Sequence, residues 1–184
     1  MISEIVRNRR SVYPVQYNDS PITKEELTKI LEAANWAPTH RRTEPWRFKV
    51  FHGESQLALG NFLSESYKTN AEKFSERTYN KLKENMAKAG AVIAICMQRD
   101  PNESIPEWEE IASTAMAVQN MWLVASQLKI GSYWSSPGVK QYLGNHISLK
   151  EGERCLGFFY LGKYDEELPE GTRASDISEK TEWI

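Results

Sequence analysis

Apolar residues recur at helical spacing after Pro21, where the chain also carries signals for the start and end of a helix. Thr23 and Glu26 stand three residues apart, as in a capping box, and Pro38 follows the last apolar position. The apolar face between them comprises Leu27, Ile30, Leu31 and Ala34. This pattern predicts one amphipathic helix that ends before Pro38.

Residues 54–90 continue the helical pattern, with apolar side chains at four-residue steps such as Leu82 and Met86. The segment predicts two helices whose many Lys and Glu residues form a solvated face. Such a pair can still cover a binding site.

A longer helix is predicted from Glu107 to Ile130, because its acidic first turn suits the positive end of a helix. Polar Gln119, Asn120 and Gln127 interrupt its apolar positions and argue against a membrane span. We expect a central helix that is buried on several sides.

Four segments have the pattern of strands. Residues 46–51 alternate apolar and cationic side chains, which predicts a strand with one buried face, and residues 91–97 form an apolar, β-branched run typical of a buried strand. Residues 131–136 and 154–161 predict two more strands, with a short helix over 139–143 between them. The tail over 164–184 has no such pattern and ends in an apolar pair.

Composition indicates one soluble domain over residues 1–184. The net charge of −2 and the pI of about 6.0 give no basic field, so neither nucleic acid nor an anionic membrane is an expected partner. The first residues, Met1 to Ser11, lack the apolar core of a signal peptide, so we expect a cytoplasmic protein.

The two cysteines lie in apolar runs, Cys96 in residues 91–97 and Cys155 in residues 155–161. Neither has a CxxC partner or a nearby histidine. Two core thiols are therefore favoured over a disulfide or a redox pair.

Familiar catalytic motifs are absent: the chain has no HExxH, GxSxG, Walker-type or GxGxxG sequence. Its three histidines, at 40, 52 and 146, are far apart, which argues against a metal site.

Two short stretches have the chemistry of a ligand site. Arg9, Arg10 and Ser11 offer guanidinium groups that pair with phosphate oxygens and a hydroxyl that adds a donor. Taken alone, however, they are better explained as the positively charged C-terminal end of a first helix over residues 3–9. The loop over residues 37–45 joins a helix to a strand and either binds a ligand or is a solvated turn punctuated by prolines.

Taken together, these stretches resemble the flavin-dependent nitroreductase family. Arg9-Arg10-Ser11, Ala37-Pro38-Thr39-His40 and Glu44-Pro45-Trp46-Arg47-Phe48 are similar in order and spacing to the family pattern RRS…AP…(Q/E)PW.F. Further similarity lies at residues 106–109, 131–136 and 157–162. The short length and the histidine after Ala-Pro-X are most similar to the small YdjA-like branch.

The resemblance implies an α+β fold with a mainly antiparallel sheet flanked by helices. It also implies an interlocked homodimer, in which each FMN lies in a pocket built by both subunits. The C-terminal tail, about residues 164–184, is then expected to pack on the partner subunit.

The same resemblance implies a set of cofactor-binding residues. Arg9, Arg10 and Ser11 correspond to positions that hold the FMN phosphate and ribityl chain, and Trp36 and His40 to positions that reach the flavin of the other subunit. Trp134, Ser135 and Ser136 correspond to a strand that lines the ring. Arg173 and Lys163 are further candidates for the phosphate, but their spacing departs from the family.

The implied activity is transfer of a hydride from NAD(P)H to FMN and then of electrons to a nitroaromatic, quinone-like or other conjugated acceptor, in ping-pong order. The cofactor carries the chemistry, so no side chain is named as catalytic. Two alternatives remain open: a flavin-binding sensor or carrier with negligible turnover, and a module whose His40-Arg41-Arg42 segment recognises an acidic partner or nucleic acid.

Overall fold

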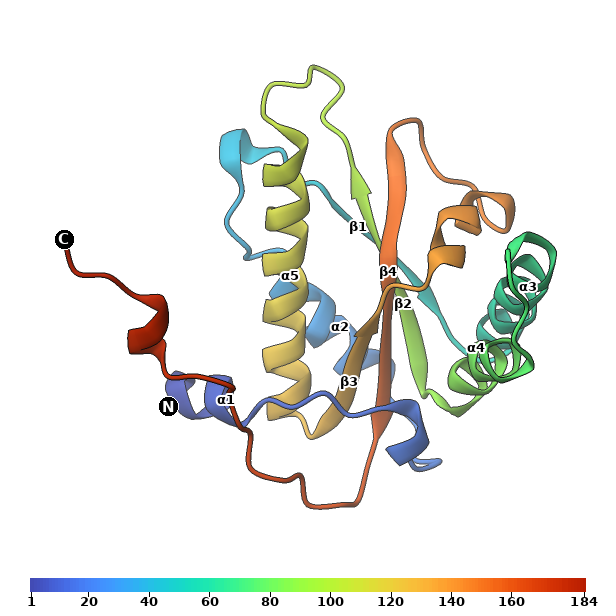
Figure 1. The fold of residues 1–184 in the computed structure, drawn as a ribbon, viewed down its shortest axis with the longest axis horizontal. Helices are drawn as coiled ribbons and strands as arrows, with labels where there is room; N and C mark the ends of the chain where they lie inside the picture. The colour runs from blue at the N-terminus through green and yellow to red at the C-terminus, as the bar shows by residue number, and fades with distance from the viewer.

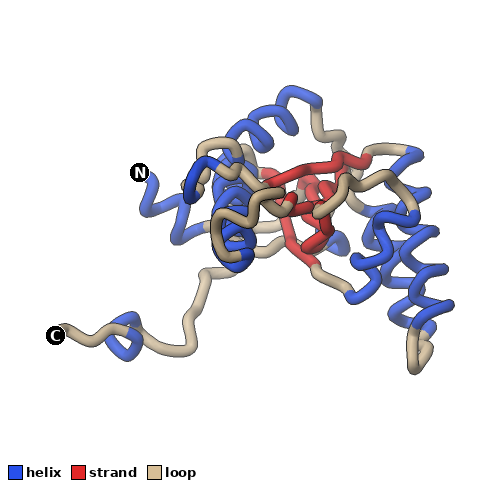
Figure 2. Tube along the Cα trace, turned by 90° about the horizontal axis from the view of Figure 1, so that it is seen from above, coloured by secondary structure: helices blue, strands red, loops and turns tan.

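The computed structural model describes residues 1–184 and has three layers, with one sheet between two groups of helices (Figures 1 and 2). The strands are β1 (Trp46–Phe51), β2 (Ala91–Gln98), β3 (Ile130–Ser135) and β4 (Glu153–Lys163). The α-helices are α1 (Ile2–Asn8), α2 (Lys24–Ala34), α3 (Glu54–Asn70), α4 (Glu76–Lys88) and α5 (Glu107–Gln127). Short 3-10 helices are η1 (Pro14–Gln16), η2 (His40–Arg42), η3 (Gly138–Asn145) and η4 (Ile177–Lys180).

The sheet has the strand order β1-β2-β4-β3, and every neighbouring pair is antiparallel. The α+β fold with an antiparallel sheet flanked by helices is thus confirmed. Each of the four predicted strands is present within two residues of its expected ends, and the predicted short helix over 139–143 is the 3-10 helix η3.

Alternating residues of the central strands divide the core between the two faces of the sheet. Ile93 and Phe159 join the cluster covered by α2 and α5, whereas Val92 and Phe158 join the cluster covered by α3, α4 and η3. Because successive strand side chains point to opposite faces, both β2 and β4 must be apolar throughout. This explains the uninterrupted apolar run that predicted β2.

The capping box that predicted α2 is present. The Thr23 hydroxyl accepts a hydrogen bond from the backbone N–H of Glu26, and the Glu26 carboxylate accepts one from the N–H of Thr23. Glu26 also forms an ion pair with Lys163 at the end of β4. One carboxylate therefore both caps α2 and ties it to the sheet.

Helix α5 is less enclosed than its sequence predicts. Met116 and Trp108 are exposed on the side away from the sheet, so the expectation of burial on several sides is wrong for the single chain. The first turn instead contains a fully buried carboxylate, Glu110, which pairs with Arg99 and accepts a hydrogen bond from the N–H of Asp100 at 2.8 Å. None of the helices has the length and apolar composition needed to cross a membrane.

The two edges of the sheet differ. Along β3, the N–H of Val12 donates to the carbonyl of Ser132 at 3.1 Å, so the N-terminal segment covers this edge. Along β1, the Arg47 guanidinium donates to the carbonyls of Glu44 and Trp46, each at 2.8 Å.

The C-terminal tail leaves the end of β4 and runs outward past α1 (Figures 1 and 2). No residue after Lys163 is buried, and the terminal Trp183 is 95% exposed. The tail touches the body near its start, where Arg10 donates to the carbonyl of Pro169 at 3.0 Å.

Candidate functional site

Arg9 lies just after α1 and is held against helix α5. Its guanidinium carbon is 4.6 Å from the centre of the Trp122 ring, a cation–π contact. The Nη1 atom of Arg9 is buried and has no hydrogen-bond partner in the chain. A buried, unpartnered N–H of a charged group is costly, which makes Arg9 a candidate to bind an anion.

Two further arginines surround Arg9. Burial first, and then the charges of Arg173 and Arg10, lower the pKa of the Arg9 guanidinium. Guanidinium groups remain charged at neutral pH, so three positive charges gather where the tail passes the N-terminal segment. Arg173, distant in sequence, is thereby brought close to Arg9.

Arg10 has a different environment, because backbone carbonyls already occupy its guanidinium. It donates to the carbonyls of Arg7, Arg9 and Pro169, and its guanidinium packs over Gly171, where a Cβ would lie only 2.6 Å away. Arg10 therefore links the start of the chain to its tail. Of the two adjacent arginines, Arg9 is the one with a free buried donor.

The segment that carries Ser11 is fixed against β3. Besides the Val12–Ser132 hydrogen bond, the Tyr17 hydroxyl donates to the carbonyl of Val12 at 2.8 Å. The Ser11 side chain itself is exposed. The backbone thus places the Ser11 hydroxyl beside the edge strand β3. This hydroxyl forms no hydrogen bond within the chain.

Trp134 on β3 contains a second unpartnered buried donor, its indole Nε1. This nitrogen lies over Gly157 of β4, where a Cβ would come within 2.3 Å of it. Ser135 and Ser136 continue the strand toward η3, and Ser136 is exposed. The absence of a side chain at Gly157 therefore leaves the space that the Trp134 indole occupies.

Sequence reasoning missed Ser132 and Trp122. The Ser132 hydroxyl is buried without a partner, and the Trp122 indole donates to the carbonyl of Arg10 at 3.3 Å. The period of two along a strand places Ser132 on the same face as Trp134, a signal that could have found it. Nothing in the sequence relates Trp122 to Arg9.

Trp36 and His40 lie elsewhere in the chain. Trp36 follows α2 and is 85% exposed, and His40 Nδ1 is 2.6 Å from a Glu109 carboxylate oxygen at the start of α5. Figure 1 shows η2, which begins at His40, beside the N-terminal end of α5, whereas the Arg9 segment crosses the other end. Within one chain, Trp36 lies beside α1, whose residues Ile2 and Ile5 line the same cavity, whereas His40 is kept apart from Arg9.

The loop after His40 has an unusual backbone. Arg41, Arg42 and Glu44 have φ angles of 50°, 54° and 41°, in the left-handed region that side chains other than glycine rarely adopt. Each such residue costs free energy, and strain of this kind concentrates at binding sites. This strain favours the ligand-binding alternative for the loop over a simple turn.

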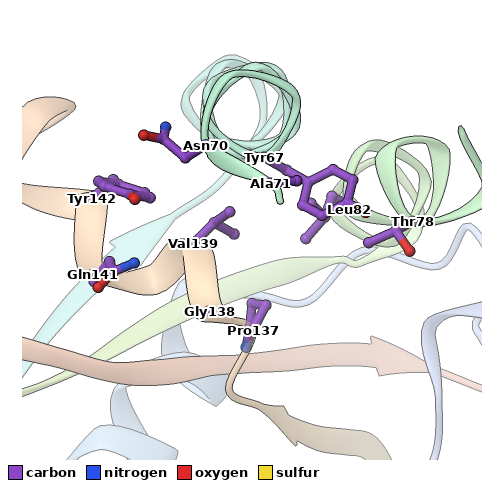
Figure 3. Close-up of a pocket in the computed structure, with 10 residues that line it drawn as sticks. All are labelled: Tyr67, Asn70, Ala71, Thr78, Leu82, Pro137, Gly138, Val139, Gln141 and Tyr142. Atoms are coloured by element: carbon purple, nitrogen blue, oxygen red, sulfur yellow. The ribbon is translucent and has the colours of Figure 1, made fainter. Parts of the chain in front are cut away.

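A cavity of about 370 Å³ lies on the other face of the sheet, between η3 and the α3–α4 pair. Figure 3 shows Val139 and Tyr142 of η3 facing Tyr67 and Leu82 of the two helices. The lining contains no charged side chain. Its lining includes Pro137, directly after Ser136, so the cavity borders the end of the segment predicted to line a flavin.

The fold is an α+β arrangement of an antiparallel sheet between helical layers, with a cluster of three arginines at one edge and an uncharged cavity on the opposite face. The model of the Nitroreductase family matches residues 6–163. The chain belongs to the nitroreductase family.

Individual relatives agree with this assignment. The chain is 28% identical to YfhC of Bacillus subtilis over 98% of its length and 92% of the relative's, and 28% identical to YdjA of Escherichia coli over 86% of each. The names of both provisionally assign NAD(P)H nitroreductase activity. A crystal structure of a nitroreductase-like family protein from Bacillus cereus is 30% identical, covers 100% of this chain and 96% of its own, and has a TM-score of 0.84.

A more distant structure shares the fold with a named cofactor. It is a nitroreductase from Desulfovibrio desulfuricans in complex with FMN, 20% identical, with a TM-score of 0.74 over 98% of this chain and 94% of its own.

Proposed function

We propose that the protein is an FMN-dependent NAD(P)H oxidoreductase that reduces nitroaromatic, quinone-like or other conjugated acceptors. The observation that carries this proposal is the buried Nη1 of Arg9, which lacks a partner amid three guanidinium groups. A phosphate would satisfy that donor and reduce the repulsion between the arginines. Structural relatives whose descriptions name FMN support the same cofactor.

The residues present fit FMN at both its ends. Arg9 and Arg173 would hold the phosphate, with Ser11 as an added donor. The unpartnered hydroxyl of Ser132 and indole nitrogen of Trp134 would donate to the polar chain or the ring. Ser135 and Ser136 lead from this surface to Pro137, where the 370 Å³ cavity begins on the other face of the sheet; we assign this cavity to the acceptor and call it the acceptor cavity.

Bound FMN supplies the hydride and electron transfer that no side chain of the protein can perform. The protein's own contribution is to bind and orient. Positive charge at Arg9 favours an anionic cofactor, and the uncharged lining of the acceptor cavity favours flat, neutral acceptors and excludes water from them. No acid or base is required from the chain.

The proposed enzyme is a homodimer. His40 lies at the end of α5 opposite the Arg9 segment, Trp36 lies beside α1, and the exposed positions of both suit contact with the flavin of a partner. The face of α5 near Trp36 includes a cavity of about 300 Å³ lined by Ile2, Ile5 and Leu123. This exposed apolar surface, together with the outward tail, suits association with a second copy.

The decisive experiment is reconstitution with FMN followed by a visible spectrum. We expect a yellow protein with bound flavin that is bleached by NADH or NADPH without oxygen and recoloured by a quinone. A yellow protein that neither nucleotide bleaches would instead identify a flavin-binding sensor or carrier. A colourless protein would overturn both.

A further inference from the structure

The only two cysteines of the chain are neighbours across the centre of the sheet. Cys96 on β2 is the register partner of Cys155 on β4, and both are free thiols. Both belong to the cluster on the α3, α4 and η3 face, so their side chains point the same way. The prediction of two buried core thiols is confirmed, but their adjacency depends on the pairing of β2 with β4, which spacing along the chain does not reveal.

The backbone geometry permits a bond between them. Facing residues of an antiparallel pair have Cα atoms about 4.5–5.5 Å apart, and disulfides span about 4.4–6.8 Å. The register shifts between Ile95 and Cys96, because Leu156 forms a bulge opposite them. A bulge bends the strand locally and leaves room for adjustment that a regular ladder lacks.

The two thiols differ in their access to solvent. Cys155 lines a cavity of about 330 Å³ that also contains Lys140 and Arg154, whereas Cys96 is completely buried beneath it. The carboxylate in the same cavity, Glu153, is paired with Lys49 at 2.8 Å. A small oxidant that enters the cavity therefore meets Cys155 and not Cys96, close to the positive charge of Lys140, which forms no ion pair.

The thiols also differ in acidity. A hydrogen bond with Cys96, and further the charge of Lys140, lower the pKa of Cys155 against the opposing effect of burial. The same interaction with Cys155, followed by burial, raises the pKa of Cys96. Because the thiolate is the reactive form, Cys155 is the better nucleophile of the pair.

We propose that Cys155 is a peroxide-reactive thiol and that Cys96 is its resolving partner. The Cys155 sulfur attacks a hydroperoxide, the O–O bond breaks, and the products are a sulfenic acid and water or an alcohol. The Cys96 sulfur then attacks the sulfenic sulfur. The S–S bond forms as the S–O bond breaks, and the Cys96 proton leaves with the hydroxide as water. Two electrons pass in total from the cysteines to the peroxide.

The test uses the full-length protein, which is first reduced and then treated with hydrogen peroxide. The product is alkylated under denaturing conditions, and its mass is measured by mass spectrometry. The chain has two cysteines, so an internal disulfide can only join this pair. We expect a mass lower by two hydrogens, no alkylation, and full reversal by dithiothreitol, which does not reverse methionine oxidation. Two alkylated cysteines after treatment, or a disulfide between chains, would overturn the proposal.

Variants assign the two roles. Cys96→Ser should stop at a sulfenic acid on Cys155 that dimedone traps, and Cys155→Ser should leave Cys96 unreactive. Lys140→Gln, which leaves both thiols in place, should slow disulfide formation several-fold. Lys29→Gln on α2, on the opposite face of the sheet, is the matched control and should react at the unaltered rate. Dimedone labelling of Cys96 in Cys155→Ser would refute the assignment.

Discussion

Arg9 has a buried donor that the protein alone does not satisfy, so its replacement should affect binding more than folding. A hydrogen bond to a charged group contributes about 1.5–3 kcal/mol. We expect Arg9→Gln to raise the dissociation constant for FMN by roughly tenfold to a hundredfold. Titration followed by quenching of flavin fluorescence measures this change.

Arg7→Gln is the control for that experiment, because Arg7 is exposed and contacts only the exposed carboxylate of Glu170, at 3.3 Å. Its affinity for FMN should match that of the original protein. Equal affinities for both variants would remove Arg9 from the phosphate site.

Thr78 offers a way to fill the acceptor cavity without disturbing the core. It lines the cavity from the first turn of α4 and is exposed. We expect Thr78→Trp to raise the KM for a quinone acceptor several-fold and to leave the rate of flavin reduction by NAD(P)H unchanged. Lys81→Trp, exposed on the same helix but outside the cavity, should change neither constant. An unchanged KM in Thr78→Trp would place the acceptor elsewhere.

At the scale of elements, the junction of β2 with α5 depends on one buried ion pair. Removing Glu110 leaves the N–H of Asp100 without its partner and Arg99 with only the Ile105 carbonyl and the exposed Glu103, so Glu110→Ala should lower the free energy of unfolding by about 3 kcal/mol. Glu107→Ala, in the same helical turn, breaks only the half-exposed pair with Arg154 and should cost less than about 1 kcal/mol. Urea unfolding of both variants distinguishes a buried from a surface pair.

The contact between α2 and β4 should make stability depend on pH. The hydrogen bond from Lys163 lowers the pKa of Glu26 from its ordinary value of 4.5. The stabilisation is therefore complete above pH 4.5 and is lost as the pH falls through the lower folded value. Glu26→Gln keeps an acceptor for the cap but loses the charge. Its free energy of unfolding should fall less than that of the original protein between neutral and acidic pH, and parallel curves would contradict this.

Elements with local signals were predictable from the sequence. The capping box of α2 and the apolar run of β2 depend on neighbouring residues, and both are present. The left-handed backbone conformations of Arg41, Arg42 and Glu44 were not predictable, because none of these positions is a glycine or asparagine, the residues that usually adopt them. The exposed face of α5 was also missed, since an apolar face looks the same in sequence whether it packs inside one chain or against another.

At the scale of the whole molecule, the tail is the element with the least support from its own chain. We predict that the full chain is a dimer in sedimentation and that deletion of residues 174–184, which keeps Arg173, yields a monomer. The body should still unfold cooperatively, because no residue beyond Lys163 is buried. A dimer that survives the deletion would show that the tail does not hold the subunits together.

The candidate site was predictable only in part. Motif residues such as Arg9 and Trp134 were found from local sequence, and both have the unpartnered buried donors described above. The approach of Arg173 to Arg9 depends on the path of the tail. The lack of a hydrogen-bond partner for the buried Ser132 hydroxyl depends on which residues cover β3. Such features arise from tertiary packing, which spacing along the chain does not encode.

The Arg47 guanidinium on β1 has a consequence for aggregation. An open edge strand presents carbonyl groups that can template intermolecular sheets. Arg47 binds the carbonyls of Glu44 and Trp46 with its own charged group, so an incoming strand would meet a cation in place of free acceptors. The opposite edge is covered by the Val12 segment. A single chain thus carries a charged guard at the start of one sheet edge and a covering segment along the other.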